Sequence, residues 1–176
     1  KTGTHTFSGG QDGAPAAISD IVGSVGSPPA VPGRGLELFR NAEAVDVNLL
    51  AAPMPIVPYG GIPYDVASRL MEICSERGDC MSIMAVPYGK TVQQAVDWQN
   101  GLGGGPYDPT AALNSNYGAL YYPWLKVYDS LEDSEVWVSP EGHAAAVMAY
   151  TDEVADPWWA AAGMMRGILN DVLDVE

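Results

Sequence analysis

The chain has few basic residues for its size. Its 176 residues contain 8 Lys and Arg against 22 Asp and Glu, which gives a formal net charge of −14. Nucleic acids and anionic membranes would repel such a chain, and so few scattered cations would displace few counterions from a phosphate backbone. We therefore expect no nucleic-acid partner and no membrane partner.

Cysteine is also scarce. The two cysteines, Cys74 and Cys80, are too few for a disulfide scaffold and indicate a protein made in a reducing compartment. Their spacing is not Cys-x-x-Cys, and the two histidines, His5 and His143, are distant in the sequence. Buried core thiols are therefore favoured over a redox pair or metal ligands.

Long apolar runs are missing as well. No stretch approaches the roughly 20 consecutive apolar residues that span a bilayer. Hydrophobic residues nevertheless make up 47% of the chain, which is too many for a disordered acidic tail. A chain of this length buries roughly 70% of its unfolded surface. We expect one globular domain, or one domain with a small appendage.

Regular elements begin after a segment, residues 1–44, that is rich in small residues, Gly and Pro. We expect this segment to be loop-rich and to pack on an α/β domain of residues 45–176. Residues 45–53 and 80–86 are typical of buried strands, and residues 65–77 and 92–100 of amphipathic helices. Gly78 stands where a C-terminal cap belongs, and Thr91 with Gln94 forms a capping box. This alternation predicts parallel strands with helices packed on the sheet.

The second half of the chain gives weaker signals. Residues 101–109 form a glycine-rich loop, and residues 119–128 resemble an aromatic strand in which Pro123 requires an edge or a bulge. A further strand is expected around residues 136–138, followed by a helix from His143 to about Tyr150. The predicted fold class is α/β, with a mixed, largely parallel sheet, helices packed on it and Gly/Pro-rich loops.

Two glycine motifs resemble nucleotide-binding signatures but lack a required residue. The GKT run at residues 89–91 has Met84 where a P-loop needs its first glycine, and the capping box explains the same residues. The glycine loop at 101–106 has Pro106 where a dinucleotide fingerprint needs glycine, and it follows a helix instead of a strand. Neither motif predicts a cofactor.

Catalytic and metal-binding patterns are equally incomplete. His143 has no accompanying nucleophile signature, and a polar residue just inside a helix start is ordinary. The acids between Asp129 and Glu135 lack the order of a calcium loop and favour a solvated turn. Residues 127–176 contain eleven acids and one base, Arg166, so the negative charge is concentrated in this part.

Large apolar side chains gather near the end of the chain. Trp158 and Trp159 follow Pro157, and Met164 and Met165 come shortly after. Side chains of this kind either pack on their own domain or bind a neighbour. The sequence leaves both alternatives open.

An ordered set of motifs resembles the contractile-tail sheath proteins of bacteriophages. Residues 135–152 (EVWVSPEGHAAAVMAYTD) are similar to a family stretch that ends in Ala-Arg-Thr-Asp, and residues 158–167 (WWAAAGMMRG) follow it as in the family. The upstream matches, in order, are residues 8–13 (SGGQDG), 36–39 (LELF), 48–53 (NLLAAP) and 121–129 (YYPWLKVYD). The chain departs from the pattern at Tyr150, where Arg is common, and at residues 160–162, which lack the usual Pro.

The resemblance implies a structural subunit that polymerises helically around an inner tube and contracts to drive the tube through a target cell envelope. It implies contacts with other sheath subunits, the tube protein and a baseplate, a place in the virion tail after assembly in the host cytoplasm, and neither catalysis nor a cofactor. It also implies a loop and then a strand after Arg166, whereas Met165, Ile168 and Leu169 have helical spacing; we follow the resemblance.

Apolar residues continue to the end of the sequence, so we expect a fragment of a longer subunit, monomeric on its own. Assembly contacts are expected at the two clusters described above. These are the acidic turn and the tryptophan pair: Asp129, Glu132, Asp133, Glu135, Trp158 and Trp159. Two other functions stay open: an α/β enzyme with a site near His143, and a protein-binding module in which the tryptophans dock one partner.

Overall fold

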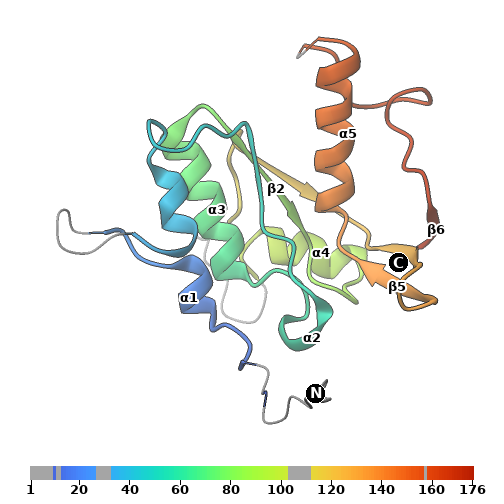
Figure 1. The fold of residues 1–176 in the computed structure, drawn as a ribbon, viewed down its shortest axis with the longest axis horizontal. Coiled ribbons are helices and arrows are strands. Elements are labelled where there is room, and N and C mark those ends of the chain that lie inside the picture. Colours follow the sequence, from blue (N-terminus) through green and yellow to red (C-terminus); the bar gives the residue numbers. More distant parts are fainter. Residues whose placement is uncertain (1–9, 11–12, 27–32, 103–111, 157) are drawn as a thin grey trace, which may run out of the picture.

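The computed structural model describes residues 10, 13–26, 33–102, 112–156 and 158–176. Their strands form two separate three-stranded sheets (Figure 1). The elements in chain order are α1 (Ile18–Val22), the 3-10 helix η1 (Gly35–Arg40), β1 (Leu49–Ala51), α2 (Ile56–Tyr59), α3 (Tyr64–Arg77), β2 (Met81–Ala85), α4 (Val92–Gln99), β3 (Gly118–Tyr121), β4 (Leu125–Asp129), β5 (Ser134–Val138), α5 (Glu141–Val154) and β6 (Val172–Val175).

The first sheet is parallel and has the order β1-β2-β3. Leu49 pairs with Met81, and Ser82 pairs with Gly118. Helix α3 connects β1 to β2, and α4 lies between β2 and β3, as parallel crossovers require. The predicted helices, the second strand and the parallel pairing are confirmed here. The first strand is shorter than the predicted residues 45–53.

The central strand β2 is buried on both faces. Residues 82–85 are each at most 2% exposed. Met84 belongs to the same buried cluster as Leu70 of α3, and side chains alternate along a strand, so Ile83 and Ala85 face the other way. Helix α5 contacts β1 and β2 and lies across β2 from α3 (Figure 1). The side chains of β2 are apolar except for Ser82, whose hydroxyl donates to the Tyr117 carbonyl at 3.0 Å, and such a composition suits a strand covered on two sides.

Helix α3 ends at a glycine that reverses the chain toward β2. Gly78 has a φ of 72°, a left-handed conformation that glycine adopts without a steric cost, and its N–H donates to the Cys74 carbonyl at 2.9 Å. The Arg77 side chain, 1% exposed, donates to the carbonyl oxygens of Phe39 and Val45 at 2.5 and 3.0 Å. This arginine therefore attaches η1 and the segment before β1 to the end of α3.

A buried carboxylate anchors η1 on α3. The Glu37 side chain is 2% exposed and pairs with Arg40 at 2.8 Å and with Arg69 of α3 at 3.1 Å. The hydrogen bond from Arg40 is the main reason why the pKa of Glu37 lies below its usual range. Helix α1 also contacts α3 and η1. The predicted boundary between a loop-rich segment of residues 1–44 and an α/β domain of residues 45–176 stays a prediction.

The single strand predicted for residues 119–128 is wrong. The chain leaves the first sheet after Tyr121 and enters the second at Leu125, with Pro123 between them. Proline cannot donate to a strand ladder, which favours a break at this place. The second sheet is antiparallel, in the order β5-β4-β6. One largely parallel sheet is therefore not confirmed: the fold is mixed α/β with one parallel and one antiparallel sheet.

Trp124 joins the two sheets. Its indole N–H donates to the Val86 carbonyl at 2.7 Å, and its ring meets the Tyr88 ring edge-on with centroids 5.2 Å apart. Gly61 has a φ of 95°, and a Cβ built there would lie 2.9 Å from the Trp124 ring, so no side chain fits without a shift. The backbone of Trp124 also exchanges hydrogen bonds with Glu176, beside β6.

The end of the chain follows the resemblance and not the helical spacing. Strand β6 is present, and residues 164–169 form no helix. Helix α5 begins at Glu141, before the predicted His143, and continues past Tyr150 to Val154. Most of the glycine loop at 101–106, and most of the motif at residues 8–13, lie outside the described residues.

We predict that Thr91→Ala lowers the free energy of unfolding by about 1 kcal/mol. The Thr91 hydroxyl accepts from the Gln94 N–H at 3.3 Å, and the Gln94 side chain accepts from the Thr91 N–H at 3.0 Å, so alanine removes one half of the capping box. Urea denaturation measures the change. Thr91→Ser keeps the hydroxyl and should retain most of the stability; an equal loss in both variants would contradict the cap.

Candidate functional site

The acidic turn lies at the tip of the β4–β5 hairpin. Asp129 and Ser134 form the last pair before the turn, and Leu131 at the tip is 94% exposed. Asp129 accepts a hydrogen bond from the Leu131 N–H at 2.8 Å. Asp133 has a φ of 50° and accepts from the Tyr128 hydroxyl, which raises the pKa of Tyr128. Two of the four predicted acids therefore hold the shape of the turn.

The other two acids differ in their pairing. Glu135 pairs with Lys126 on the neighbouring strand, and this hydrogen bond is the main reason why the pKa of Lys126 is raised. The Lys126 ammonium also lies 5.9 Å from the centre of the Trp137 ring. Glu132 is exposed, and no ion pair involves it among the described residues. Glu132 is thus the acid of this turn most available to another molecule.

The tryptophan pair follows α5 on the surface. Trp158 is 78% exposed, whereas Trp159 is 48% exposed and has the Arg166 guanidinium 4.2 Å from its ring centre. Met164 and Met165 are about as open as Trp158. The sequence left packing and docking open for both tryptophans. The structure packs Trp159 partly on its own segment and leaves Trp158 uncovered.

The acidic turn and the tryptophan pair do not form one site. Helix α5 starts beside the second sheet and points away from it (Figure 1). Its 14 residues extend about 20 Å, with the tryptophans after the far end. The chain therefore presents two separate candidate contact regions.

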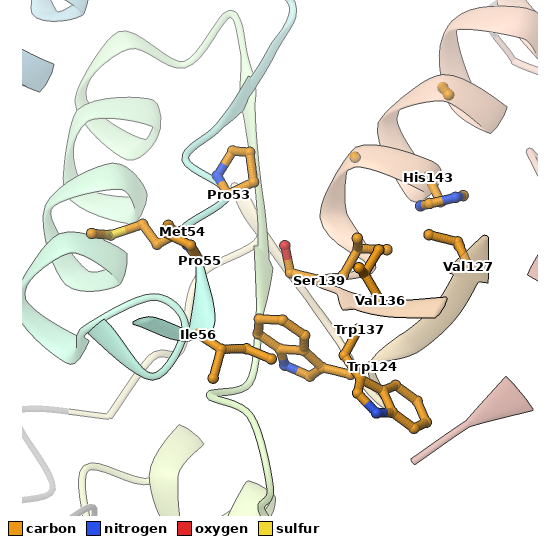
Figure 2. A pocket seen from close by; sticks show the side chains of 13 residues that line it. Pro53, Met54, Pro55, Ile56, Trp124, Val127, Val136, Trp137, Ser139 and His143 are labelled. Carbon is orange, nitrogen blue, oxygen red and sulfur yellow. The ribbon is translucent and has the colours of Figure 1, made fainter. Parts of the chain in front are cut away.

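An apolar pocket of about 780 Å³ lies between the loop after β1, strands β4 and β5 and the start of α5. Figure 2 shows Met54 and Ile56 on one side, Trp124 and Trp137 below, and His143 next to Val127 on the other side. The polar side chains in the lining are those of Ser139, His143 and the two indoles. Among the described residues, no carboxylate lines this pocket beside His143.

The structure reveals one unusual acid that sequence reasoning missed. Glu141, at the start of α5, is 0% exposed, and neither carboxylate oxygen accepts a hydrogen bond of ordinary geometry from the described residues. Burial raises the pKa of Glu141 above its ordinary 4.5, and the helix backbone and the Ser139 hydroxyl oppose this only in part. An acid in the first turn of a helix is common, so no sequence signal pointed to it.

Two further features bear on function. Among the described residues, no group of three or more His, Cys, Asp or Glu side chains is placed to hold a metal ion. In the same part of the chain, no helix combines the length and the apolar character needed to cross a membrane.

We predict that Glu141→Gln stabilises the protein at neutral pH. Because the pKa of Glu141 is raised in the folded state, this acid does not reduce the free energy of unfolding at a pH where it is protonated in both the folded and the unfolded protein. The free energy of unfolding then falls as the pH rises through the folded-state pKa. The free energies of unfolding of variant and wild type should therefore converge near about pH 4 and separate by about 1.4 kcal/mol for each unit by which burial raises the pKa. Chemical denaturation across this pH range measures the difference.

The exposed Glu153 on the same helix provides the matched control. Glu153→Gln removes the same charge without relieving burial, so it should change the pH dependence little. A Glu141→Gln difference that is independent of pH would contradict the titration of a buried carboxylate.

Comparisons with known proteins identify relatives over most of the chain. It is 25% identical to the tail sheath protein of Vibrio phage KVP40 over 98% of this chain and 26% of that protein. It is 26% identical to the tail sheath protein of Enterobacteria phage T4 over 78% of this chain and 22% of that protein. No family model matches. The chain spans about a quarter of the length of these relatives. The chain is thus similar to the tail sheath proteins of two bacteriophages, as its ordered motifs indicated.

Proposed function

We propose that this chain is an α/β domain of a contractile tail sheath subunit in a phage virion. The observation that carries the proposal is the similarity to two phage tail sheath proteins, one of them along nearly the whole chain. Because the chain spans about a quarter of those proteins, the function proposed is that of the complete subunit to which this domain contributes.

In this proposal, subunits polymerise helically around an inner tube and meet copies of themselves, the tube protein and a baseplate. Contraction exchanges one set of contacts between subunits for another and drives the tube through the target envelope. Open helical polymers arise from contacts between two different surfaces of a subunit. Two separate candidate regions, the acidic turn and the tryptophan pair, are compatible with such a lattice.

Contraction by rigid-body movement requires domains that keep their shape while their interfaces change. The contacts of Trp124 with Val86, Tyr88 and Glu176 connect the two sheets through both side chain and backbone. The apolar pocket beside the second sheet has no carboxylate next to His143 among the described residues that line it. These features support a structural domain better than an enzyme.

Electron microscopy of the full-length protein expressed alone tests this proposal. We expect hollow polymers with the width and periodicity of a tail. The protein-binding alternative, for which the exposed Trp158 is the supporting observation, instead predicts discrete one-to-one complexes with a different protein. Particles that stay discrete in conditions that favour assembly, and that capture one heterologous partner, would overturn the sheath proposal.

We predict that Glu132→Lys in the full-length subunit reduces the assembled fraction or changes its dependence on salt. The substitution reverses a charge at the hairpin tip while keeping the contacts of Asp129, Asp133 and Glu135 that shape and brace the turn. Sedimentation at several salt concentrations measures the assembled fraction, since exposed charges are screened over about 8–10 Å. Neutralising all four acids would be less informative, because it would also disturb the turn.

Glu43→Lys is the matched control. Glu43 is exposed and lies in the N-terminal half, far in sequence from the hairpin, and the substitution changes the net charge equally. If both variants assemble alike, the acidic turn is not a specific contact.

A further inference from the structure

The two cysteines lie against each other in the protein core. Cys74 occupies the last turn of α3 and is 0% exposed, and Cys80 directly precedes β2 and is 5% exposed. Both belong to one buried cluster, and Cys80 is near enough to Cys74 to contribute to the raised pKa of its thiol. The predicted core location is thus confirmed, but the thiols are also neighbours, which the spacing did not indicate.

A short reversal of the chain produces this contact. Residues 75–79 connect the two cysteines, and the Gly78 N–H bonds to the carbonyl of Cys74 itself. Arg77 and Asp79 pair at 2.8 Å across the turn, and the N–H of Met81, next to Cys80, donates to Asn48 of the neighbouring chain segment at 2.9 Å. Backbone hydrogen bonds at Cys74 and next to Cys80 therefore fix the positions of both cysteines.

We propose that Cys74 and Cys80 are a modification site that closes into an internal disulfide in the presence of a low-molecular-weight disulfide such as oxidised glutathione. The Cys80 thiolate, at the slightly more accessible residue, attacks the small disulfide and releases one small thiol. The Cys74 thiolate then attacks the Cys80 sulfur and releases the second. The protein loses two protons and two electrons, and the small disulfide is reduced to two thiols.

Burial determines how this reaction proceeds. Loss of water raises the pKa of Cys74 to about 12, and the adjacent Cys80 adds to the effect. Few Cys74 thiolates are present in the closed fold, so exchange is slow until the turn between α3 and β2 opens. The finished disulfide would be shielded from reductants by the same core. It would join the end of α3 to the start of the central strand β2 without changing the outer surface, and it does not depend on the sheath proposal.

Refolding in glutathione buffers, followed by digestion with trypsin without reduction, tests this pair directly. Trypsin cleaves after Arg69, Arg77 and Lys90, so the cysteines fall on separate peptides, residues 70–77 and 78–90. We expect these peptides to be linked in oxidising buffer, with no alkylation of either cysteine, and to separate after reduction. Unlinked peptides that carry glutathione or the alkylating agent, or links between two chains, would overturn the proposal.

Thermal unfolding gives an independent measurement. The oxidised protein should have a Tm roughly 5 °C above that of the reduced protein. Cys74→Ser and Cys80→Ser should each form a glutathione adduct on the remaining thiol and show no such rise. A linked peptide without a rise in Tm would contradict the bracing role. If a serine variant does not fold, the wild-type digest still decides whether the pair forms.

Discussion

Burial of strand β2 on both faces is the constraint on which the rest of the structure depends. A central parallel strand must be covered on two sides, because its apolar side chains point alternately up and down. Helix α3, which directly precedes β2 in the chain, covers Met84 and its neighbours. Ile83 and Ala85 need a second cover, which comes from α5 more than fifty residues later. The long return of the chain to the sheet follows from this need.

The position of α5 has a direct electrostatic consequence. Its first residue, Glu141, lies in the interior and is fully buried, so its carboxylate is not exposed to solvent. Backbone N–H groups at the start of the helix favour the charged carboxylate and lower the pKa of Glu141. Burial has the larger effect and raises this pKa. Packing of the sheet thus takes precedence over the solvation of one acid, which is a common cause of perturbed pKa values outside active sites.

Local signals in the sequence predicted the first half of the fold well. The capping box of Thr91 and Gln94, the capping Gly78 and the largely apolar run of β2 each specify an element from neighbouring residues alone. The second half depends on distant pairings. Nothing local showed that Pro123 divides residues 119–128 between two sheets, because a proline is equally compatible with a strand edge or a bulge.

The candidate site was harder to predict for the same reason. Composition located the acids of the turn, but Asp129 and Asp133 proved to be structural because of contacts within the hairpin. Arg166 follows Trp159 by seven residues in an irregular segment, so its position over the ring could not be read from periodicity. Trp158 and Glu132 are exposed in the structure and are therefore available to another molecule. The sequence alone could not distinguish them from the neighbouring groups that already have a partner in the fold.

The distribution of cations explains why the outer surface is so acidic. Most basic side chains of the described residues already have a partner within the chain. They are Arg40 and Arg69 on Glu37, Arg77 on backbone carbonyls, Lys126 on Glu135 and Arg166 on Trp159. Arg34 and Lys90 have no ion pair within the described part of the chain. Two acidic faces of this domain would therefore repel each other unless they are separated by more than a Debye length, about 8–10 Å.

In the proposed assembly, this repulsion restricts which contacts between copies can form. A contact through this domain must either use cations from elsewhere in the subunit or rely on apolar side chains that need no counter-charge. Trp158, Met164 and Met165 are such side chains, and they lie beyond the end of α5, away from the acidic turn. The repulsion therefore favours pairing the acidic turn of one subunit with a basic surface of another part of the protein, and leaves the tryptophan segment for an apolar contact. Such a division gives two unlike surfaces, which is the requirement for an open helical lattice instead of a closed dimer.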